Sequence, residues 1–252
     1  MSPLEVRGLT KSYPAGDSSR PMLGWLAGRR SADRVFALKD ISFTADAGEI
    51  VGLVGPNGSG KSTMLRILAT LELADAGEII VGSLDLAEHA AEIRRKTGVV
   101  LADDVGFEPR ATLRENLEFY GALCGRHVGR PDIYYALDAM GLAVLADDLA
   151  GSLGSGQLRR LSLARALLGD PWVLLLDEPA RSVDAEFAAR IADVIRHAAH
   201  SRGATVILVS HSPEEVRNLC DRSLLLDRGR LLHVTAPRKP AVAAHTAVGR
   251  SS

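Results

Sequence analysis

Three short runs of the chain are almost wholly apolar, at residues 50–54, 172–176 and 205–209. Runs of this kind are typical of strands that are buried on both faces of a parallel sheet. Residues 184–200 instead carry apolar side chains at helical spacing, which predicts an amphipathic helix between two of these strands. The alternation of buried strands with helices favours an α/β fold.

Further strands are predicted from shorter patterns. An extended N-terminal segment covers about residues 4–13, and strands follow at 41–44 and 77–81. Near the C-terminus, a turn at 227–230 separates two more strands, as in a hairpin. We therefore expect a mixed core sheet together with an antiparallel N-terminal sheet.

Between about residues 85 and 156 the pattern becomes helical. Thr112 and Glu115 have the spacing of a capping box that opens a helix. The apolar face of this helix is predicted to hold Leu113, Leu117, Tyr120 and Leu123. A second helix is predicted over 132–140, ended by Gly141. We interpret 85–156 as a helical subdomain inserted into one domain that spans residues 1–234.

Two segments differ in composition from the predicted core. Residues 14–34 are rich in Pro, Gly, Ser and Arg, which predicts a loop insertion, and they contain a small apolar cluster around Trp25. Two interpretations of this cluster remain open: contact with a partner or a membrane interface, or packing over its own domain. Residues 235–252 have little to bury and are predicted to form a flexible tail.

Composition narrows the class of protein. The 252 residues are 46% apolar and 24% charged, as in a soluble globular protein with a full core. The net charge of −1 gives no long-range attraction to nucleic acid, so we expect no nucleic-acid partner. The chain begins without a secretion signal and has no apolar run of 18 residues. Cys124 and Cys220 lack metal-ligand spacing and fit a reducing, cytoplasmic compartment.

The most specific motif begins at Gly55, directly after a buried strand. It fits the G-x-x-x-x-G-K-[ST] pattern of a phosphate-binding loop, and an ordinary glycine-rich turn would not require all of the fixed positions. Backbone N–H groups and a helix N-terminus would face a triphosphate, Lys61 would reach its β- and γ-phosphates, and Ser62 would bind Mg²⁺. The candidate binding residues are Gly55, Pro56, Asn57, Gly58, Ser59, Gly60, Lys61, Ser62 and Thr63.

An acidic pair follows the second apolar run. Asp177 would lie beside the loop, where it can hold Mg²⁺, and Glu178 can deprotonate an attacking water molecule. The alternative is a strand that merely ends in two carboxylates, which is less favoured once a phosphate-binding loop precedes it.

With these motifs the chain resembles the ATP-binding subunits of ABC transporters over about residues 4–234. The resemblance implies the ABC cassette fold of the P-loop NTPases, with ATP and Mg²⁺ as cofactors. It also implies roles for three more residues. Tyr13 would stack on adenine, His211 would sense the γ-phosphate as part of the catalytic group, and Asp184 would lie in a loop that crosses a dimer interface.

The family's signature turn resembles LSGGQ, and residues 153–157 match it. The resemblance implies that Gly154, Ser155, Gly156 and Gln157 close over ATP held by a second cassette chain, in a head-to-tail homodimer or heterodimer. Gly154 occupies the usual position of the family serine, so the hydroxyl has moved by one residue to Ser155.

A second departure concerns the metal. The family's Mg²⁺-binding glutamine is matched by Ala102, which cannot bind a metal ion. Our hypothesis is that Asp103 replaces it, because a carboxylate is a hard oxygen ligand. The open alternative is that Asp103 and Asp104 only cap a loop. Residues 105–112 are expected to face a membrane partner.

The resemblance implies ATP hydrolysis that drives transport through a separate integral membrane permease, with this chain peripheral to the cytoplasmic face. The motifs at 101–104 and 113–120 look most like those of exporters of polysaccharide, lipid or drug-like substrates. Two alternatives come from other classes: a soluble ABC-type ATPase acting on DNA or the ribosome, and a P-loop kinase. The first usually carries a long coiled-coil insertion or two cassettes, and the second has no use for a signature turn.

Overall fold

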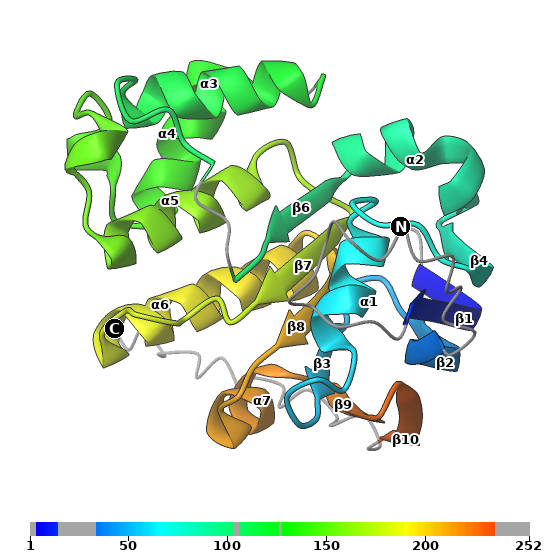
Figure 1. Ribbon diagram of the computed structural model, residues 1–252. Helices are drawn as coiled ribbons and strands as arrows, with labels where there is room; N and C mark the ends of the chain where they lie inside the picture. Colours follow the sequence, from blue (N-terminus) through cyan, green and yellow to red (C-terminus); the bar gives the residue numbers. More distant parts are fainter. Residues whose placement is uncertain (1–3, 15–33, 103–105, 126–127, 235–252) are drawn as a thin grey trace, which may run out of the picture.

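A six-stranded sheet forms the centre of the fold, described for residues 4–14, 34–102, 106–125 and 128–234 of a computed structural model (Figure 1). Its strand order is β10-β9-β3-β8-β7-β6. All neighbours are parallel except β10, which runs antiparallel to β9, so the predicted mixed sheet is confirmed. The strands are β3 (Ile50–Val54), β6 (Thr97–Val100), β7 (Val173–Asp177), β8 (Thr205–Val209), β9 (Arg222–Asp227) and β10 (Arg230–Val234).

The three apolar runs of the sequence form the adjacent strands β3, β8 and β7. Every residue of β7 is buried. Side chains alternate between the faces of a strand, so Val173 and Leu175 pack in one core cluster while Leu174 and Leu176 pack in another. Because both faces are covered, β7 carries no polar side chain until Asp177.

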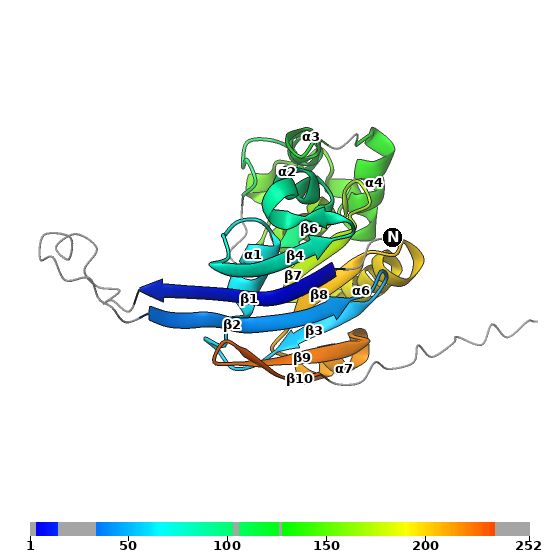
Figure 2. The same ribbon diagram turned by 90° about the vertical axis from the view of Figure 1, so that its right-hand side faces the viewer.

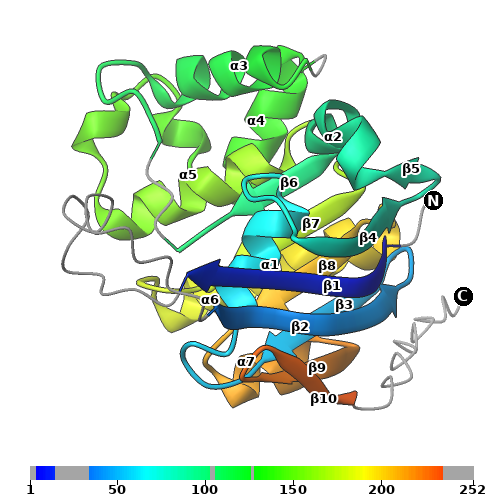
Figure 3. The ribbon, with the colours of Figure 1, turned by 45° about the vertical axis from the view of Figure 1, so that its right-hand side comes forward.

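A four-stranded antiparallel sheet covers one face of the core sheet, in the order β2-β1-β4-β5. Its strands are β1 (Leu4–Pro14), β2 (Arg34–Ala45), β4 (Ala76–Val81) and β5 (Leu84–Asp85). Helix α1 (Lys61–Leu68) lies between the sheets, where Met64 shares a core cluster with Leu4 and Leu175. Figure 3 shows β1 and β2 crossing in front of α1. The predicted antiparallel N-terminal sheet is confirmed.

Helices cover the opposite face. A second core cluster there includes residues of α3 (Leu113–Leu123), α4 (Arg130–Ala139), α5 (Ser155–Leu167), α6 (Ala185–Arg196) and α7 (Pro213–Leu219). Helix α2 (Leu86–Arg95) buries Ile93 in the first cluster. Short helical turns span Ala143–Leu145, Ala150–Ser152 and His197–Ser201. In Figures 1 and 2, α3 and α4 lie at the end of the molecule away from β9 and β10.

Local sequence signals for helix ends are confirmed. Thr112 and Glu115 form a reciprocal capping box at the start of α3, with bonds of 2.8 and 3.1 Å. Asp184 caps α6 as well, which was not predicted from the sequence, by accepting from the backbone N–H of Phe187 at 2.8 Å. Helix α4 ends before Gly141, whose φ of 62° lies in the left-handed region.

The expectation of a helical stretch over 85–156 needs a correction, because Thr97–Val100 forms strand β6 and pairs with β7. Four residues are too few to show a period. Gly98 marks the place where α5 closes on this strand, since a Cβ there would collide with the backbone oxygen of Ala166. On α3, Leu117 is buried as predicted, but Leu123 is 68% exposed.

Some predictions fall outside the described residues. They are the apolar cluster of the loop insertion, the aspartates Asp103 and Asp104, and the tail over 235–252. Within the described parts of the chain, no helix is both long and apolar enough to span a membrane.

Candidate functional site

The predicted phosphate-binding loop lies between β3 and α1. Gly55 has a φ of 151° and Gly60 a φ of 108°, a backbone region that favours glycine. A Cβ at Gly55 would collide with the backbone oxygen of Leu226, and one at Gly60 with that of Ala37. The loop therefore needs glycine at both positions, because strands β9 and β2 press against its backbone.

Two polar side chains in this loop are buried. The Lys61 ammonium donates to the backbone oxygens of Gly55 at 2.8 Å and Pro56 at 2.9 Å. Burial lowers the pKa of Lys61, and the carboxylates of Asp177 and Glu178 oppose that shift. The Ser59 hydroxyl has no hydrogen-bond partner in the described part of the chain. A phosphate group fits these donors, because it supplies acceptor oxygens for both.

Ser62 and Asp177 lie side by side beneath the loop. The Ser62 hydroxyl donates to Asp177 Oδ2 at 3.4 Å. Burial raises the pKa of Asp177, and the neighbouring Glu178 raises it further. The described residues contain no group of three or more His, Cys, Asp or Glu side chains that could hold a metal by themselves. Two adjacent oxygen ligands nevertheless fit Mg²⁺, which usually keeps water and substrate phosphates in its shell.

Glu178 and His211 meet where β7 and β8 end. Glu178 Oε1 lies 3.1 Å from His211 Nε2, and Glu178 Oε2 lies 3.6 Å from Arg181 Nε. Glu178 has a φ of 50°, and its N–H donates to the backbone oxygen of Val209 at 2.9 Å. A non-glycine residue in this conformation is held there by its surroundings, as is common at active sites.

A single cleft joins these groups. Its lining residues are Ala37, Asn57, Gly58, Gly60, Lys61, Ser62, Thr63, Ala102, Asp177, Glu178, Val209 and His211. The structure therefore brings together the loop, the acidic pair and the histidine that the sequence singled out. Ala102 lines the same cleft, so the position that matches the family glutamine lies at the site although it carries no ligand.

The signature turn and Asp184 do not line this cleft. Gly154 is the N-cap of α5, where its N–H donates to Gln157 Oε1 at 3.0 Å, and Ser155 is exposed at the first helical position. Gly156 packs against the loop after β7, since a Cβ there would lie 2.9 Å from the backbone oxygen of Ser182. The predicted roles of these residues require a second chain and stay predictions.

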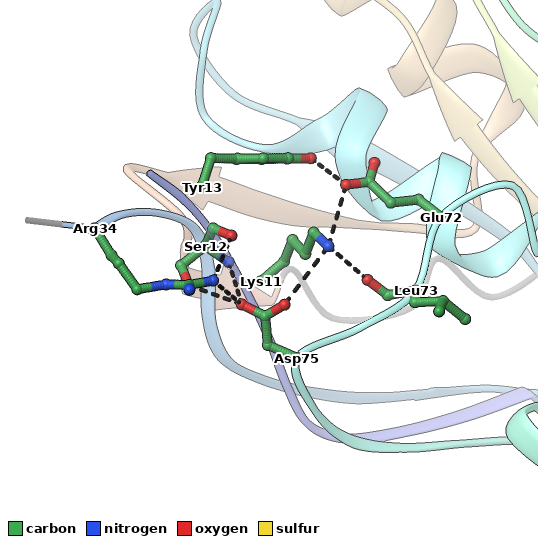
Figure 4. A network of polar contacts seen from close by, with 7 residues as sticks. All are labelled: Lys11, Ser12, Tyr13, Arg34, Glu72, Leu73 and Asp75. Atoms are coloured by element: carbon green, nitrogen blue, oxygen red, sulfur yellow. Dashed lines mark hydrogen bonds and ion pairs between the residues drawn. The ribbon is translucent and has the colours of Figure 1, made fainter. Parts of the chain in front are cut away.

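Tyr13, on β1, belongs to a polar network that joins the antiparallel sheet to the segment between α1 and β4 (Figure 4). Its hydroxyl donates to Glu72 Oε1 at 2.5 Å, and Lys11 lies 5.5 Å from the centre of its ring. Burial and the Glu72 hydrogen bond raise the pKa of Tyr13, while the side chain of Thr63 opposes the shift. Thr63 lines the cleft, so Tyr13 is close to the site, and the residue is 39% exposed.

One residue of the site was not singled out by the sequence. Arg159, in the second turn of α5, is buried, and its guanidinium donates to the backbone oxygens of Leu101, Asp177 and Glu178. Arg160 follows it directly and packs over the Phe187 ring instead. The sequence gives no signal that separates these two arginines, because nothing in it shows which one faces the core.

Comparison with known proteins gives a consistent result. The family model described as ABC transporter matches residues 38–181. The chain is 32% identical over 210 residues to the ABC transporter ATP-binding protein NatA of Bacillus subtilis, covering 81% of this chain and 85% of that protein. It is 37% identical over 215 residues to the Nod factor export ATP-binding protein I of Rhizobium sp., covering 84% and 70%.

The fold has the same likeness. A solved dimeric bacterial ABC transporter cassette superposes with a TM-score of 0.78 at 27% identity, covering 94% of this chain and 99% of that one. Because 94% of this chain is covered, the correspondence includes both sheets and the helices packed against them.

Proposed function

The chain belongs to the ABC transporter family, as its ATP-binding and ATP-hydrolysing subunit, and we propose that it powers export through a separate membrane-spanning protein. The observation that carries this proposal is the single cleft that holds Lys61, Ser62, Asp177, Glu178 and His211. Each of these side chains has a distinct task in phosphoryl transfer to water.

Binding of the nucleotide is assigned to the loop. Lys61 and the loop amides would bind the β- and γ-phosphates and stabilise the negative charge that develops during hydrolysis. Ser62 and Asp177 would hold Mg²⁺, with Asp103 as a further proposed ligand. When bound, the ion neutralises charge on the phosphate oxygens.

Hydrolysis is assigned to the pair at the strand ends. Glu178 would accept a proton from the attacking water, since its carboxylate lines the cleft. His211, 3.1 Å from this carboxylate, would contact the γ-phosphate and keep the base oriented. Tyr13 would stack on the adenine ring beside Thr63.

We propose that two cassettes act together. The signature turn does not line its own chain's cleft, so it is available to close over ATP held by a partner. Each nucleotide would then lie between the phosphate-binding loop of one chain and residues 154–157 of the other. Asp184 would cross the same interface, and the partner could be a second copy or a different cassette.

Export is supported by the names of relatives, one of which is a Nod factor export protein. The substrate class we propose is a polysaccharide, lipid or drug-like molecule. The chain would attach to the cytoplasmic face of the membrane through its permease, with residues 105–112 facing that partner. The relatives named above give no support to a ribosome- or DNA-acting ATPase or to a kinase.

A fractionation experiment tests the transport role. The tagged chain is expressed alone and together with a candidate permease, chosen as any polytopic membrane protein that a neighbouring gene encodes. We expect the chain in the membrane fraction only when the partner is present, and we expect ATP hydrolysis by the detergent-extracted complex to vanish in Lys61→Ala. A chain that stays in the supernatant beside a correctly inserted partner would contradict the proposal.

A further inference from the structure

Arg159 connects three parts of the site through one guanidinium group. Its Nη1 donates to the backbone oxygen of Leu101 at 2.7 Å, at the end of β6 and directly before Ala102. Its Nη2 donates to the backbone oxygen of Glu178 at 2.7 Å and also to that of Asp177. One side chain therefore holds the residue that follows β6, the last residue of β7 and the proposed base.

This arrangement is poorly explained by packing alone. Arg159 is only 9% exposed, and burial lowers its pKa while Asp177 and Glu178 oppose that shift. Its Nε–H is buried and lacks an acceptor among the described residues. An apolar side chain of similar length usually stabilises a core at least as well as a buried cation with an unsatisfied donor.

The backbone oxygens that accept from Arg159 indicate what the buried guanidinium does. Glu178 has a φ of 50°, so its carbonyl and its side chain are set by a backbone conformation that non-glycine residues rarely adopt. The two hydrogen bonds to consecutive carbonyls, of Asp177 and Glu178, hold the two peptide planes that flank the Glu178 Cα. Holding both planes sets the direction of the Cα–Cβ bond from which the Glu178 side chain enters the cleft.

The same side chain belongs to the helix that begins at the signature turn. Arg159 lies two residues after Gln157, and Gly156 packs closely against Ser182 in the loop after β7. At its other end, α5 closes on β6 at Gly98. In Figure 1, α5 lies between the α3 and α4 helices and the β6 and β7 strands. A shift of the first turn of α5 would therefore move the donors that hold the base.

We propose that Arg159 is a positioning residue that ties the signature helix to the backbone of Asp177 and Glu178 and so places the Glu178 carboxylate for catalysis. This inference rests on the proposed role of Glu178 as base. It adds that engagement of this chain's signature at one ATP site is transmitted to the catalytic base of the other.

The test separates placement of the base from nucleotide binding and folding. Arg159→Lys keeps the charge but has one nitrogen for three carbonyls, and Arg159→Met keeps the apolar stem without donors. For the full chain we expect kcat to fall at least tenfold in both variants. The ATP Kd, measured in Glu178→Gln background to prevent turnover, should change by less than threefold. Arg160→Lys is the matched control on the same helix turn and should keep wild-type kcat.

Cooperativity supplies a readout that a purely structural role would not move. If wild-type turnover depends on ATP with a Hill coefficient above 1, the Hill coefficient of the residual turnover in Arg159→Lys should fall toward 1. Wild-type kcat in both Arg159 variants would overturn the inference. A parallel loss of kcat, ATP binding and thermal stability would overturn it as well, by assigning Arg159 to folding. Failure of the proposed base is distinguishable, because Glu178→Gln alone would then keep its turnover.

Discussion

The imidazole Nε2 of His211 lies 3.1 Å from carboxylate oxygen Oε1 of Glu178, across the ends of two neighbouring strands. Strands β7 and β8 run parallel, with Asp177 opposite Val209, so residues that follow the two strands meet at one edge of the sheet. The contact joins the proposed base to the residue proposed to sense the γ-phosphate. From this contact we predict the effect of replacing Glu178.

Glu178→Gln is expected to abolish turnover while ATP still binds. The amide has nearly the same size and can still meet His211, but it cannot accept a proton from water. Loss of a general base lowers rates by about 10²- to 10⁴-fold. Single-turnover hydrolysis and calorimetric ATP binding measure the two quantities separately. His211→Ala serves as the comparison, and the Glu178 assignment fails if Glu178→Gln keeps more than a tenth of wild-type kcat.

The ring of Tyr13, rather than its hydroxyl, is expected to carry ATP affinity. Tyr13→Phe removes the hydrogen bond to Glu72 but keeps the π face, so the ATP Kd should change by less than about threefold. Tyr13→Ala removes a stacking contact worth about 1–3 kcal/mol and should weaken binding about tenfold or more. Fluorescent-nucleotide titration tests both variants. Equal affinity in wild type and Tyr13→Ala would exclude a stacking role.

Much of the fold could be predicted because its signals are local or strongly periodic. β3, β7 and β8 are continuous apolar runs, and burial on both faces of the sheet requires them to be so. The capping box at Thr112 depends on residues only three positions apart. The phosphate-binding loop is equally local, because its glycines are fixed by close backbone contacts.

The remainder depends on contacts between distant segments, which one sequence does not reveal. β6 is too short to show a period, and it forms a strand because it pairs with β7. Arg159 and Arg160 are indistinguishable in sequence, yet only Arg159 meets the ends of β6 and β7. Leu123 is exposed because the described segments leave most of its side chain uncovered, which the sequence of α3 alone does not show.

Asp75 should stabilise the folded protein at neutral pH but not in acid. Hydrogen bonds from Ser12 lower the pKa of Asp75 to about 2, with Lys11 and Arg34 assisting. Because the folded pKa lies below the unfolded value near 3.8, the stabilisation is present above pH 4 and is lost as pH falls toward 2. We expect Asp75→Asn to lower Tm at pH 6 and to approach wild type at pH 2–3. A Tm difference that stays constant across this range would contradict the linkage.

Asp103 is proposed as a replacement metal ligand because Ala102 lines the cleft without an oxygen ligand. Asp103→Ala is expected to raise the Mg²⁺ concentration for half-maximal hydrolysis by at least about tenfold, the scale of losing one contact to a metal site. Asp104→Ala is the matched control, with the same charge removed one position along the chain. If the Mg²⁺ dependence of hydrolysis is unchanged in Asp103→Ala, Asp103 is not a metal ligand, and the interpretation that it only caps a loop holds instead.

Gly154 has space for the serine that the family usually carries. A Cβ there would have Gln157 Oε1 as its nearest neighbour, at 3.9 Å, and the φ of −72° and ψ of 165° suit any residue. Serine is also a good N-cap for α5, although replacing glycine at an N-cap changes stability by only a few tenths of a kcal/mol. Gly154→Ser should therefore fold normally and restore a hydroxyl at the tip of the signature turn.

If the missing hydroxyl limits closure, Gly154→Ser should strengthen the ATP-bound dimer. A hydrogen bond to a charged phosphate contributes about 1.5–3 kcal/mol, so dimerisation in the Glu178→Gln background should tighten by about tenfold or more. Sedimentation with and without ATP measures this. Ser155→Ala completes the comparison: it should weaken the dimer in the wild-type signature only if the Ser155 hydroxyl has taken over the contact. If it has, Gly154→Ser should strengthen the ATP-bound dimer only slightly. In a Gly154→Ser background, Ser155→Ala should no longer weaken the dimer, because one hydroxyl at this turn is enough.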